Sequence, residues 1–488
     1  MPGLSGFMSI FVREFISKMT GFRDFIIEHG NDSTARLLLS REKWPDIDIS
    51  LAVNTIESRR KLKDKLPAWY GCPDLIYPNT ISAEQCSSAE TAALKASIAA
   101  SLVQDRAARI ADLTGGLGAD SCAFRDAGFE VLYNEMDCAL CNAARHNLPI
   151  LGFGDIIICE KEVRPGDISG ILGDFAPDII YLDPARRDSS GKKVFLMEDC
   201  RPDILALKDE LLGCARLVMV KLSPMADMEM VRSRLGDRCR EIHIIASKGD
   251  CRELLAILDR DWHGETQFVT WESGGTPFIF TAREKRDATA LMPATPDCLT
   301  GFLFEPGKAM LKTGAFNLIG ERFGLAKLAK STHLYLFSAN NSGDTGPDSS
   351  HPGHDGCSTE ASIEELLGFG KVFRIIRTLP LSKAGIKDAG KTWTEADVTA
   401  RNIPMTSDML RTRLRKESKE QAGKKTLPDN GAQSGKKPLL DNGAQSGMSI
   451  SGNGTGIIHI FGTRCEFSAG KADNLLIVTE KITRLSDI

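Results

Sequence analysis

Between residues 108 and 247 short apolar segments alternate with helical patterns, and this alternation constrains the fold more than any other feature of the sequence. Apolar runs of this length that are bounded by turn residues predict buried β-strands. They occupy residues 108–113, 130–135, 155–159, 178–183, 216–222 and 240–246. Strands that alternate with helices form mostly parallel sheets with helices on both faces. We therefore predict an α/β domain whose ligand site lies at the carboxyl ends of the strands.

A glycine-rich loop follows the first of these strands. The strand ends at Asp112, and the loop contains Thr114, Gly115, Gly116 and Gly118. Glycine lets the backbone approach a ligand closely, and the start of the next helix offers free N–H groups. A dinucleotide-binding loop of this type carries a third glycine, here at position 121, where the sequence has serine. The missing glycine and the acidic Asp112 favour S-adenosylmethionine over NAD, and the alternative is an ordinary turn.

A second acidic residue, Glu135, ends the second predicted strand, 23 residues after Asp112. A carboxylate at this position can accept hydrogen bonds from both ribose hydroxyls of a nucleoside cofactor. Asp112, Thr114, the three glycines and Glu135 are therefore the predicted cofactor-binding residues. The alternative for Glu135 is a solvated carboxylate at the end of a strand.

The fourth predicted strand ends in the turn Asp183-Pro184-Ala185-Arg186. Enzymes that methylate amines carry a D/N-P-P-Y/F turn at this point, whose side-chain and carbonyl oxygens hold the protons of the target amine. Methyl transfer then depends mainly on positioning and on an activated donor. Asp183, Pro184 and Arg186 are the predicted catalytic residues. Alanine and arginine replace the second proline and the aromatic residue, which removes the ring that stacks on a flipped base.

The same turn is similar to the D-P-P-R turn of uracil C5 methyltransferases, which need a cysteine nucleophile. Cys200 and Cys251 are the candidates for that nucleophile, and a structural thiol is the alternative for each.

Basic residues near these strand ends are predicted to contact the substrate. Arg186 and Arg187 can hold a phosphate, or they form a surface ion pair with a neighbouring acidic residue. Lys221, in the fifth predicted strand, can contact a substrate phosphate or carboxylate, or it pairs with Asp183 or Asp199.

The rest of the chain divides into further parts by its pattern. The expected parts are a helical region at 1–104, the alternating domain at 105–265, a small α+β domain at 266–338, a linker at 339–364 and a last α+β domain at 365–488. In the helical region, residues 87–103 predict a helix that Ser88 caps. The last domain contains two near-identical 12-residue copies, Lys424–Gly435 and Lys436–Gly447, within an insertion at 417–455 that we expect to be disordered.

Basic side chains gather at residues 401–425, where eight lysines and arginines face three acidic residues. The whole chain has a net charge of −4, so it is not a globally basic nucleic-acid coat. A local patch of this kind can contact several phosphates, and Arg411, Arg413 and Arg415 are the predicted RNA-binding residues. The alternative is a solvated helix face.

Several long segments resemble one family, the THUMP-like class I methyltransferases of bacteria. They are AEQCSSAETAALKA, ADLTGGLGADS, DIIYLDPARRD, MEDCRPDI, VKLSPMAD and GDCRELL. Residues 304–337 resemble that family's small ferredoxin-like domain, and RNIPMTSDMLRTRLR resembles the start of its THUMP-like module. The resemblance implies a Rossmann-like S-adenosylmethionine domain flanked by RNA-associated modules. By position, it also places Ser87 and Thr91 over the methionine end of the cofactor.

Together these features predict a cytoplasmic S-adenosylmethionine-dependent methyltransferase that acts on a base of tRNA or rRNA. The alternatives are a methyltransferase for a protein or small molecule, and an RNA-binding protein without catalysis. We expect no metal site, because the pair Cys138 and Cys141 has no second pair at ligand spacing. We expect no membrane span, because no 18 consecutive uncharged apolar residues occur. The thirteen cysteines suit thiols of a reducing cytosol.

Overall fold

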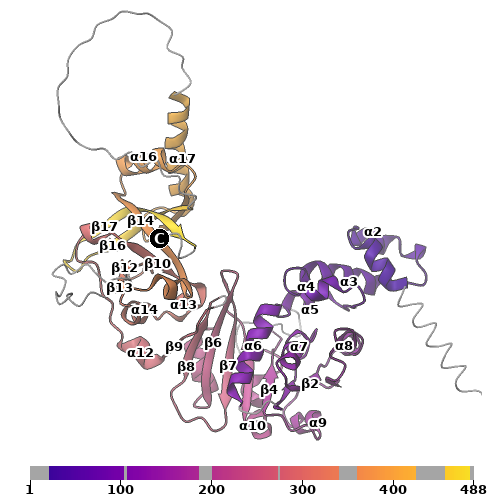
Figure 1. Ribbon diagram of the computed structural model, residues 1–488. Helices are drawn as coiled ribbons and strands as arrows, with labels where there is room; N and C mark the ends of the chain where they lie inside the picture. The colour runs from indigo at the N-terminus through magenta and orange to yellow at the C-terminus, as the bar shows by residue number, and fades with distance from the viewer. Residues whose placement is uncertain are drawn as a thin grey trace, which may run out of the picture. The chain divides into compact units, whose positions relative to one another are not determined.

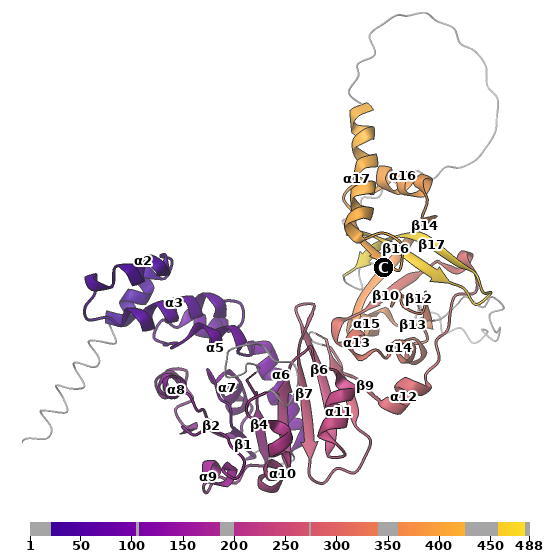
Figure 2. The same cartoon turned by 180° about the vertical axis from the view of Figure 1, so that it is seen from behind.

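The structure is a computed structural model that describes residues 21–103, 107–185, 200–272, 275–339, 360–424 and 457–483. The chain forms two compact units, Met1–Thr270 and Trp271–Ile488. Both are drawn in Figures 1 and 2. No helix of the described residues is both long and apolar enough to cross a membrane.

The first unit begins with a helical region. Its described part contains a helix at 21–29, α2 (Thr34–Leu39), α3 (Ile49–Leu62), α4 (Pro67–Gly71), α5 (Thr80–Gln85) and α6 (Ala89–Leu102). The first three of these helices enclose a small apolar core that includes Phe25, Leu37 and Ile56. As the sequence predicts, Ser88 caps α6, and its Oγ accepts a hydrogen bond of 3.2 Å from the backbone N–H of Thr91.

The central sheet of the first unit has the strand order β3-β2-β1-β4-β5-β7-β6 and continues into β8. The strands are β1 (Arg109–Asp112), β2 (Glu130–Asn134), β3 (Ile157–Cys159), β4 (Ile179–Leu182), β5 (Leu217–Leu222), β6 (Cys239–Ser247), β7 (Asp250–Asp259) and β8 (Gln267–Trp271). Strands β1 to β5 are parallel, and the order reverses between β1 and β4. Such a reversal is where open α/β sheets bind their ligands.

Helices cover both faces of this sheet. They are α7 (Ala119–Asp126), α8 (Cys138–Ile150), α9 (Ile168–Leu172), α10 (Ile204–Cys214) and α11 (Met228–Leu235), together with α6. Figure 1 shows α6 across one face, and Figure 2 shows α11 across the opposite face. Every residue of β4 and β5 is buried, as expected for central strands that are covered on both sides. The predicted Rossmann-like α/β class is therefore confirmed.

One strand of this sheet, β7, is missing from the sequence prediction. It runs antiparallel between β5 and β6. The turn between β6 and β7 consists of Lys248 and Gly249, which both have positive φ, 53° and 74°. Two positive φ values are typical of the tight hairpin turn that usually carries Asn-Gly or Asp-Gly. Because lysine stands at the first position, the sequence gives no hairpin signal here.

The second unit is built on another sheet, with the order β11-β12-β10-β14-β17-β16-β15. Its strands are β10 (Phe302–Pro306), β11 (Ala326–Lys327), β12 (Tyr335–Ala339), β14 (Gly370–Pro380), β15 (Asp397–Arg401), β16 (Ile458–Glu466) and β17 (Ala472–Ile482). Residues of this unit also form the short strands β9 (Phe278–Thr281) and β13 (Glu360–Ala361) and the helices α12 (Ala282–Asp287), α13 (Lys308–Thr313), α14 (Phe316–Arg322), α15 (Ile363–Leu367), α16 (Lys383–Thr392) and α17 (Ser407–Lys424).

The long strand β14 joins the two halves of this sheet. It pairs antiparallel with β10 through residues 370–374 and with β17 through residues 372–380. The two predicted α+β parts of the chain therefore share one sheet. Helix α17 extends to Lys424, and the remainder of both 12-residue copies lies outside the described residues.

Candidate functional site

The loop between β1 and α7 has a backbone shape that requires glycine. Gly116 and Gly118 have φ values of 55° and 86°, which side-chain-bearing residues rarely adopt. A Cβ atom on Gly115 would overlap the ring of Tyr133. Gly115, Gly116 and Gly118 therefore place no side chain between the loop backbone and a ligand.

Glu135 lies at the edge of this loop. Its Oε2 accepts a hydrogen bond of 2.9 Å from the N–H of Gly116, and its Oε1 accepts one of 2.9 Å from the N–H of Asp137. The hydroxyl of Tyr133 donates to the carbonyl of Gly116 at 2.7 Å. Each carboxylate oxygen can accept a second bond. Glu135 is thus oriented by the loop and still has acceptor capacity for a ligand.

Asp112 is buried at the end of β1, with 1% of its surface exposed. Its Oδ1 accepts a hydrogen bond of 3.1 Å from the N–H of Thr114, and its Oδ2 accepts one of 2.6 Å from the hydroxyl of Ser121. Burial raises the pKa of Asp112 to about 7, although these two hydrogen bonds oppose the shift. The serine that replaces a third glycine at position 121 therefore has a role, because it holds Asp112.

Replacing Asp112 with asparagine is expected to remove a pH dependence of stability. A carboxyl with a pKa of about 7 in the folded protein binds its proton more tightly there than in the unfolded chain. Its stabilising contribution is complete below about pH 4 and declines as the pH rises to 7, by up to about 1.4 kcal/mol per pH unit. Denaturant unfolding across this range should give a flatter stability profile for Asp112→Asn than for the wild type. Parallel profiles would contradict the assignment.

Asp183 follows β4 on the same edge of the sheet. Its backbone N–H donates a hydrogen bond of 2.6 Å to Oγ1 of Thr114, so the loop and the turn after β4 are tied together. Its Oδ2 lies 2.6 Å from Nζ of Lys221, and 28% of the side chain is exposed. Within the described residues, Oδ1 of Asp183 has no hydrogen-bond partner. Pro184 follows directly, whereas Arg186 and Arg187 lie outside the described residues.

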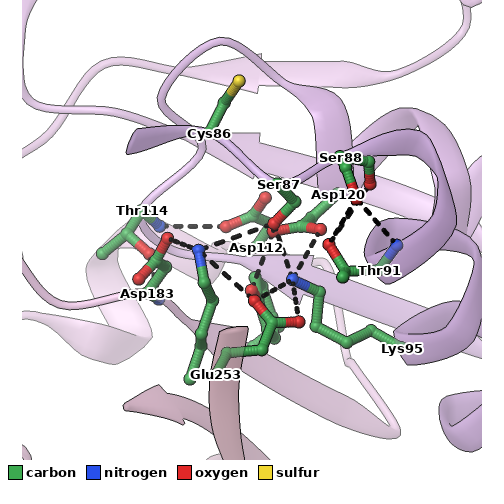
Figure 3. Close-up of polar contacts among 12 residues, drawn as sticks. Cys86, Ser87, Ser88, Thr91, Lys95, Asp112, Thr114, Asp120, Asp183 and Glu253 are labelled. Atoms are coloured by element: carbon green, nitrogen blue, oxygen red, sulfur yellow. Dashed lines mark hydrogen bonds and ion pairs between the residues drawn. The ribbon is translucent and has the colours of Figure 1, made fainter. Parts of the chain in front are cut away.

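Behind Asp183 lies a buried cluster of charged groups, shown in Figure 3. Nζ of Lys95 lies 3.1 Å from Oδ1 of Asp120 and 3.0 Å from Oε1 of Glu253, and it donates to Oγ of Ser87 at 2.6 Å. Ser87 donates in turn to Oδ2 of Asp120 at 2.9 Å. Burial acts to raise the pKa of Asp120, but Lys95 and Lys221 outweigh it and the pKa is lowered. Each of these residues is less than 10% exposed, and the buried positive and negative charges are paired with one another.

The structure brings most of the predicted site residues of the first unit to one edge of the sheet. Asp112, Thr114, Glu135, Asp183 and the three glycines surround the carboxyl ends of β1, β2 and β4. Ser87 joins them through the buried cluster. Thr91 differs, because its hydroxyl donates to the carbonyl of Ser88 at 3.3 Å and it serves the start of α6.

Sequence reasoning missed three buried charged residues, Lys95, Asp120 and Glu253. Lys95 has a visible signal, since it is an isolated charge in the alanine-rich sequence AALKASIAASL. Asp120 follows the glycine loop and resembles an ordinary acidic residue in the first turn of a helix. Glu253 lies in β7, the unpredicted strand, and meets Lys95 across 158 residues of sequence. A contact this distant leaves no local pattern.

A cysteine that sequence reasoning did not consider lies beside this cluster (Figure 3). Burial raises the pKa of Cys86 to about 11, although Lys65 and Lys221 act against the shift. A nucleophilic cysteine needs a lowered pKa, because the thiolate is the reactive form. Cys86 is therefore unsuited to the covalent attack that uracil C5 methylation requires.

The predicted RNA-binding arginines lie on α17 in the second unit. Leu410 and Leu414 are buried and fix the inner face of this helix. By the helical period, Arg411 and Arg415 lie on one flank and Arg413 on the other. Arg411 is engaged within the protein, since it pairs with Asp408 at 2.6 Å and donates to the carbonyl of Val398 at 3.3 Å. Arg413 and Arg415 are exposed.

Two family models match the chain. One describes a ferredoxin-like domain and covers residues 302–341, and the other describes a THUMP-like domain and covers residues 370–427. Both segments lie in the sheet of the second unit.

Solved structures also resemble the chain. A candidate methyltransferase from Porphyromonas gingivalis W83 is 26% identical, over 95% of this chain and 98% of that chain, with a TM-score of 0.68. A predicted O-methyltransferase from Agrobacterium tumefaciens is 22% identical, over 37% of this chain and 85% of that chain, with a TM-score of 0.28. A SAM-dependent methyltransferase from the same organism is 17% identical, over 36% and 64% of the two chains, with a TM-score of 0.27. No curated protein matches the sequence.

The fold and the glycine-loop site define a methyltransferase of the Rossmann-like class I type. The two matched segments narrow this class. Within this class, the chain combines the methyltransferase fold with a segment that matches a ferredoxin-like domain and a segment that matches a THUMP-like domain.

Proposed function

We propose that this methyltransferase uses S-adenosylmethionine to methylate RNA in the cytoplasm, at an amine of a tRNA or rRNA base. The observation that carries the proposal is Asp183, a carboxylate with one oxygen anchored and one available, next to the glycine loop. A group in this place can accept a hydrogen bond from a target amine and direct its lone pair.

The residues around the loop fit the cofactor. Glu135 would accept the ribose hydroxyls, while Asp112, Thr114, Gly115, Gly116 and Gly118 would line the nucleoside and the methionine part. The segment that contains Ser87 would cover the methionine end, whereas Thr91 serves the start of α6. The acidic residues at this edge suit a ligand that carries a sulfonium and an ammonium group. S-adenosylmethionine supplies an electrophilic methyl group on sulfur and leaves as S-adenosylhomocysteine once the acceptor nitrogen has bonded the methyl carbon.

The contribution of the chain to this reaction is mainly positional. Asp183 accepts an N–H of the target amine at Oδ1, which holds the nitrogen lone pair toward the donor. When nitrogen bonds the methyl carbon it gives up one proton, and Asp183 passes this proton to water. Pro184 stiffens the turn, and Arg186 and Arg187 would hold a phosphate of the substrate.

RNA is favoured as the substrate by the second unit. The THUMP-like segment carries α17, on which Arg413, Arg415 and Lys416 are exposed. Exposed cations at this density bind phosphates in a salt-dependent way. A methyltransferase for proteins or small molecules does not require such a surface.

The deciding experiment is methyl transfer from radiolabelled S-adenosylmethionine by the purified full-length protein. The acceptor is total RNA from cells that lack the gene, with a nuclease-treated sample as control. Counts that nuclease removes support an RNA methyltransferase, and digestion of the labelled RNA names the nucleotide. Counts that resist nuclease would favour a protein or small-molecule acceptor. Binding of RNA without any transfer would favour an RNA-binding protein without catalysis.

Replacing Glu135 with alanine is expected to weaken the binding of S-adenosylmethionine by about 1–3 kcal/mol, because the ribose hydroxyls lose a charged acceptor. Isothermal titration calorimetry measures this directly. Glu130→Ala is the control, since Glu130 lies at the opposite end of the same strand. An affinity unchanged by Glu135→Ala would remove this residue from the cofactor site.

The double variant Arg413→Ala/Lys416→Ala is expected to bind RNA with a smaller salt dependence. Each lost phosphate contact reduces the slope of log K against log salt by about 0.7–1. Filter binding at several salt concentrations gives the slope. Lys471→Ala, an exposed lysine in the turn between β16 and β17, is the control. An unchanged slope would show that RNA does not contact this flank of α17.

A further inference from the structure

The side chain of Lys221 is enclosed by oxygens of the protein itself. Its Nζ lies 2.6 Å from Oδ2 of Asp183, 3.5 Å from Oγ of Ser87 and 3.8 Å from Oε2 of Glu253. An ammonium group has three donors, and only 4% of Lys221 is exposed. Two of these contacts are hydrogen bonds and the third is an ion pair, so Lys221 is buried among partners of the protein itself and does not face a substrate phosphate or carboxylate.

Lys221 is also held in its charged form. Burial acts to lower its pKa, but Asp183, Glu253 and Asp120 outweigh burial and raise the pKa above the ordinary value. Coupling of this kind is reciprocal, and Lys221 together with Lys95 lowers the pKa of Asp120.

Other residues fix Lys221 from behind. Glu253 of β7 contacts both lysines, and Lys95 of α6 contacts Glu253 at 3.0 Å and Asp120 at 3.1 Å. The chain of contacts thus runs from α6 through β7 and β5 to the turn after β4. Each of these elements belongs to the packed interior of the first unit, so the position of Nζ of Lys221 is determined by the fold.

One carboxylate oxygen of Asp183 is therefore bound within the protein, and the other is available to a substrate. Oδ2 is bound to Lys221, and the backbone N–H is bound to Thr114, which together determine the orientation of the side chain. Oδ1 is the oxygen without a partner in the described structure. As part of an ionised carboxylate it can accept hydrogen bonds but cannot donate one.

We infer that Lys221 is a positioning residue that orients the ionised Asp183 for an acceptor that donates a hydrogen bond, with Glu253 and Lys95 supporting it. The inference rests on the proposed function and narrows it. An amine or an amide N–H is selected, whereas an acceptor that presents only a carbonyl oxygen or an unprotonated ring nitrogen is rejected. Lys221 acts through Asp183 and does not touch the substrate.

The test uses Lys221→Met in the full-length protein, which keeps the length of the side chain and removes its charge. Methyl transfer to RNA is expected to fall by about 10- to 100-fold in kcat, the value of one charge-assisted hydrogen bond. The dissociation constant for S-adenosylmethionine is expected to change by less than about threefold, because Lys221 has no place in the set that binds the nucleoside. Lys208→Met is the control, because Nζ of Lys208 donates to the carbonyl of Leu235 at the end of α11.

A second measurement does not depend on RNA. Calorimetry of S-adenosylmethionine binding in two buffers of different ionisation enthalpy gives the number of protons exchanged on binding. The groups around Lys221 that set this number are Asp183, Glu253, Asp120, Lys95, Cys86 and Lys65. Removing the lysine takes a positive charge away from the carboxylates beside it, so Lys221→Met is expected to exchange a different number of protons on binding than the wild type. A purely structural role would leave this number unchanged.

These measurements distinguish a failure of the proposed function from a failure of the inference about Lys221. Wild-type protein that binds S-adenosylmethionine but never methylates RNA would overturn the proposed function, while the proton count still decides the role of Lys221. An unchanged proton count, or a kcat within threefold of the wild type, would overturn the inference. If Lys221→Met does not fold, Glu253→Gln replaces it, because it keeps the volume and removes the charge behind Lys221. The same proton count and a kcat lower by about 3- to 10-fold are then expected.

Discussion

Alanine at position 183 is expected to lower kcat for methyl transfer to RNA by about 10²- to 10⁴-fold. The variant loses the oxygen that holds the acceptor and the group that takes its proton. Asparagine at the same position should retain part of the rate, because its carbonyl oxygen still accepts a hydrogen bond although it cannot take a proton. Rapid-quench measurements with saturating S-adenosylmethionine separate this chemical step from product release.

Asp209→Ala is the matched control for this prediction, since Asp209 is an exposed carboxylate on α10. Cofactor affinity should stay within a few-fold of the wild type in all three variants. If Asp183→Ala retained more than a tenth of the wild-type rate, the turn after β4 would not be the site of acceptor recognition. Thermal melting of Asp183→Ala should accompany the kinetics, because the change also removes a partner of the buried Lys221.

Methionine at position 95 is expected to destabilise the fold by about 3–5 kcal/mol, the usual cost of removing one partner from a buried ion pair. Lys95 is fully buried, and its removal leaves Asp120 and Glu253 without their shared cation. The free energy of unfolding from denaturant titration of the full chain measures the loss. The transition of the first unit is the one to follow, because unfolding of two units need not be a single step.

A double variant distinguishes a charge effect from a loss of packing. Lys95→Met/Glu253→Gln removes one positive and one negative charge, so the remaining charges balance as they do in the wild type. It should be more stable than Lys95→Met alone, with a coupling energy of about 1–3 kcal/mol. A double variant that is less stable than Lys95→Met would show that the lysine stabilises by packing.

The sequence could predict those parts of the site that lie at the ends of parallel strands. Asp112, Glu135 and Asp183 each follow an apolar run, and the carboxyl ends of parallel strands meet at one edge of a sheet. Their convergence therefore follows from the alternation of strands and helices. The glycine loop is predictable for the same reason, since a strand before it and a helix after it fix its place.

The buried cluster could not be predicted in this way. Lys95 and Glu253 become meaningful only when α6 lies against the sheet and β7 enters between β5 and β6. Neither event is encoded locally, because the apolar part of β7 is limited to residues 254–258, which could equally belong to a helix, and the hairpin turn begins with lysine. The partner of Lys221 was one of two options in the sequence, and only the structure shows that it is Asp183.

The shared strand β14 limits where the chain can be divided into separate fragments. It pairs with β10 of the ferredoxin-like segment on one side and with β17, beyond the THUMP-like match, on the other. Separating the segments would expose an open strand edge, which templates aggregation. A fragment that ends between the two segments would leave β10 without its partner β14, and we expect such a fragment to aggregate.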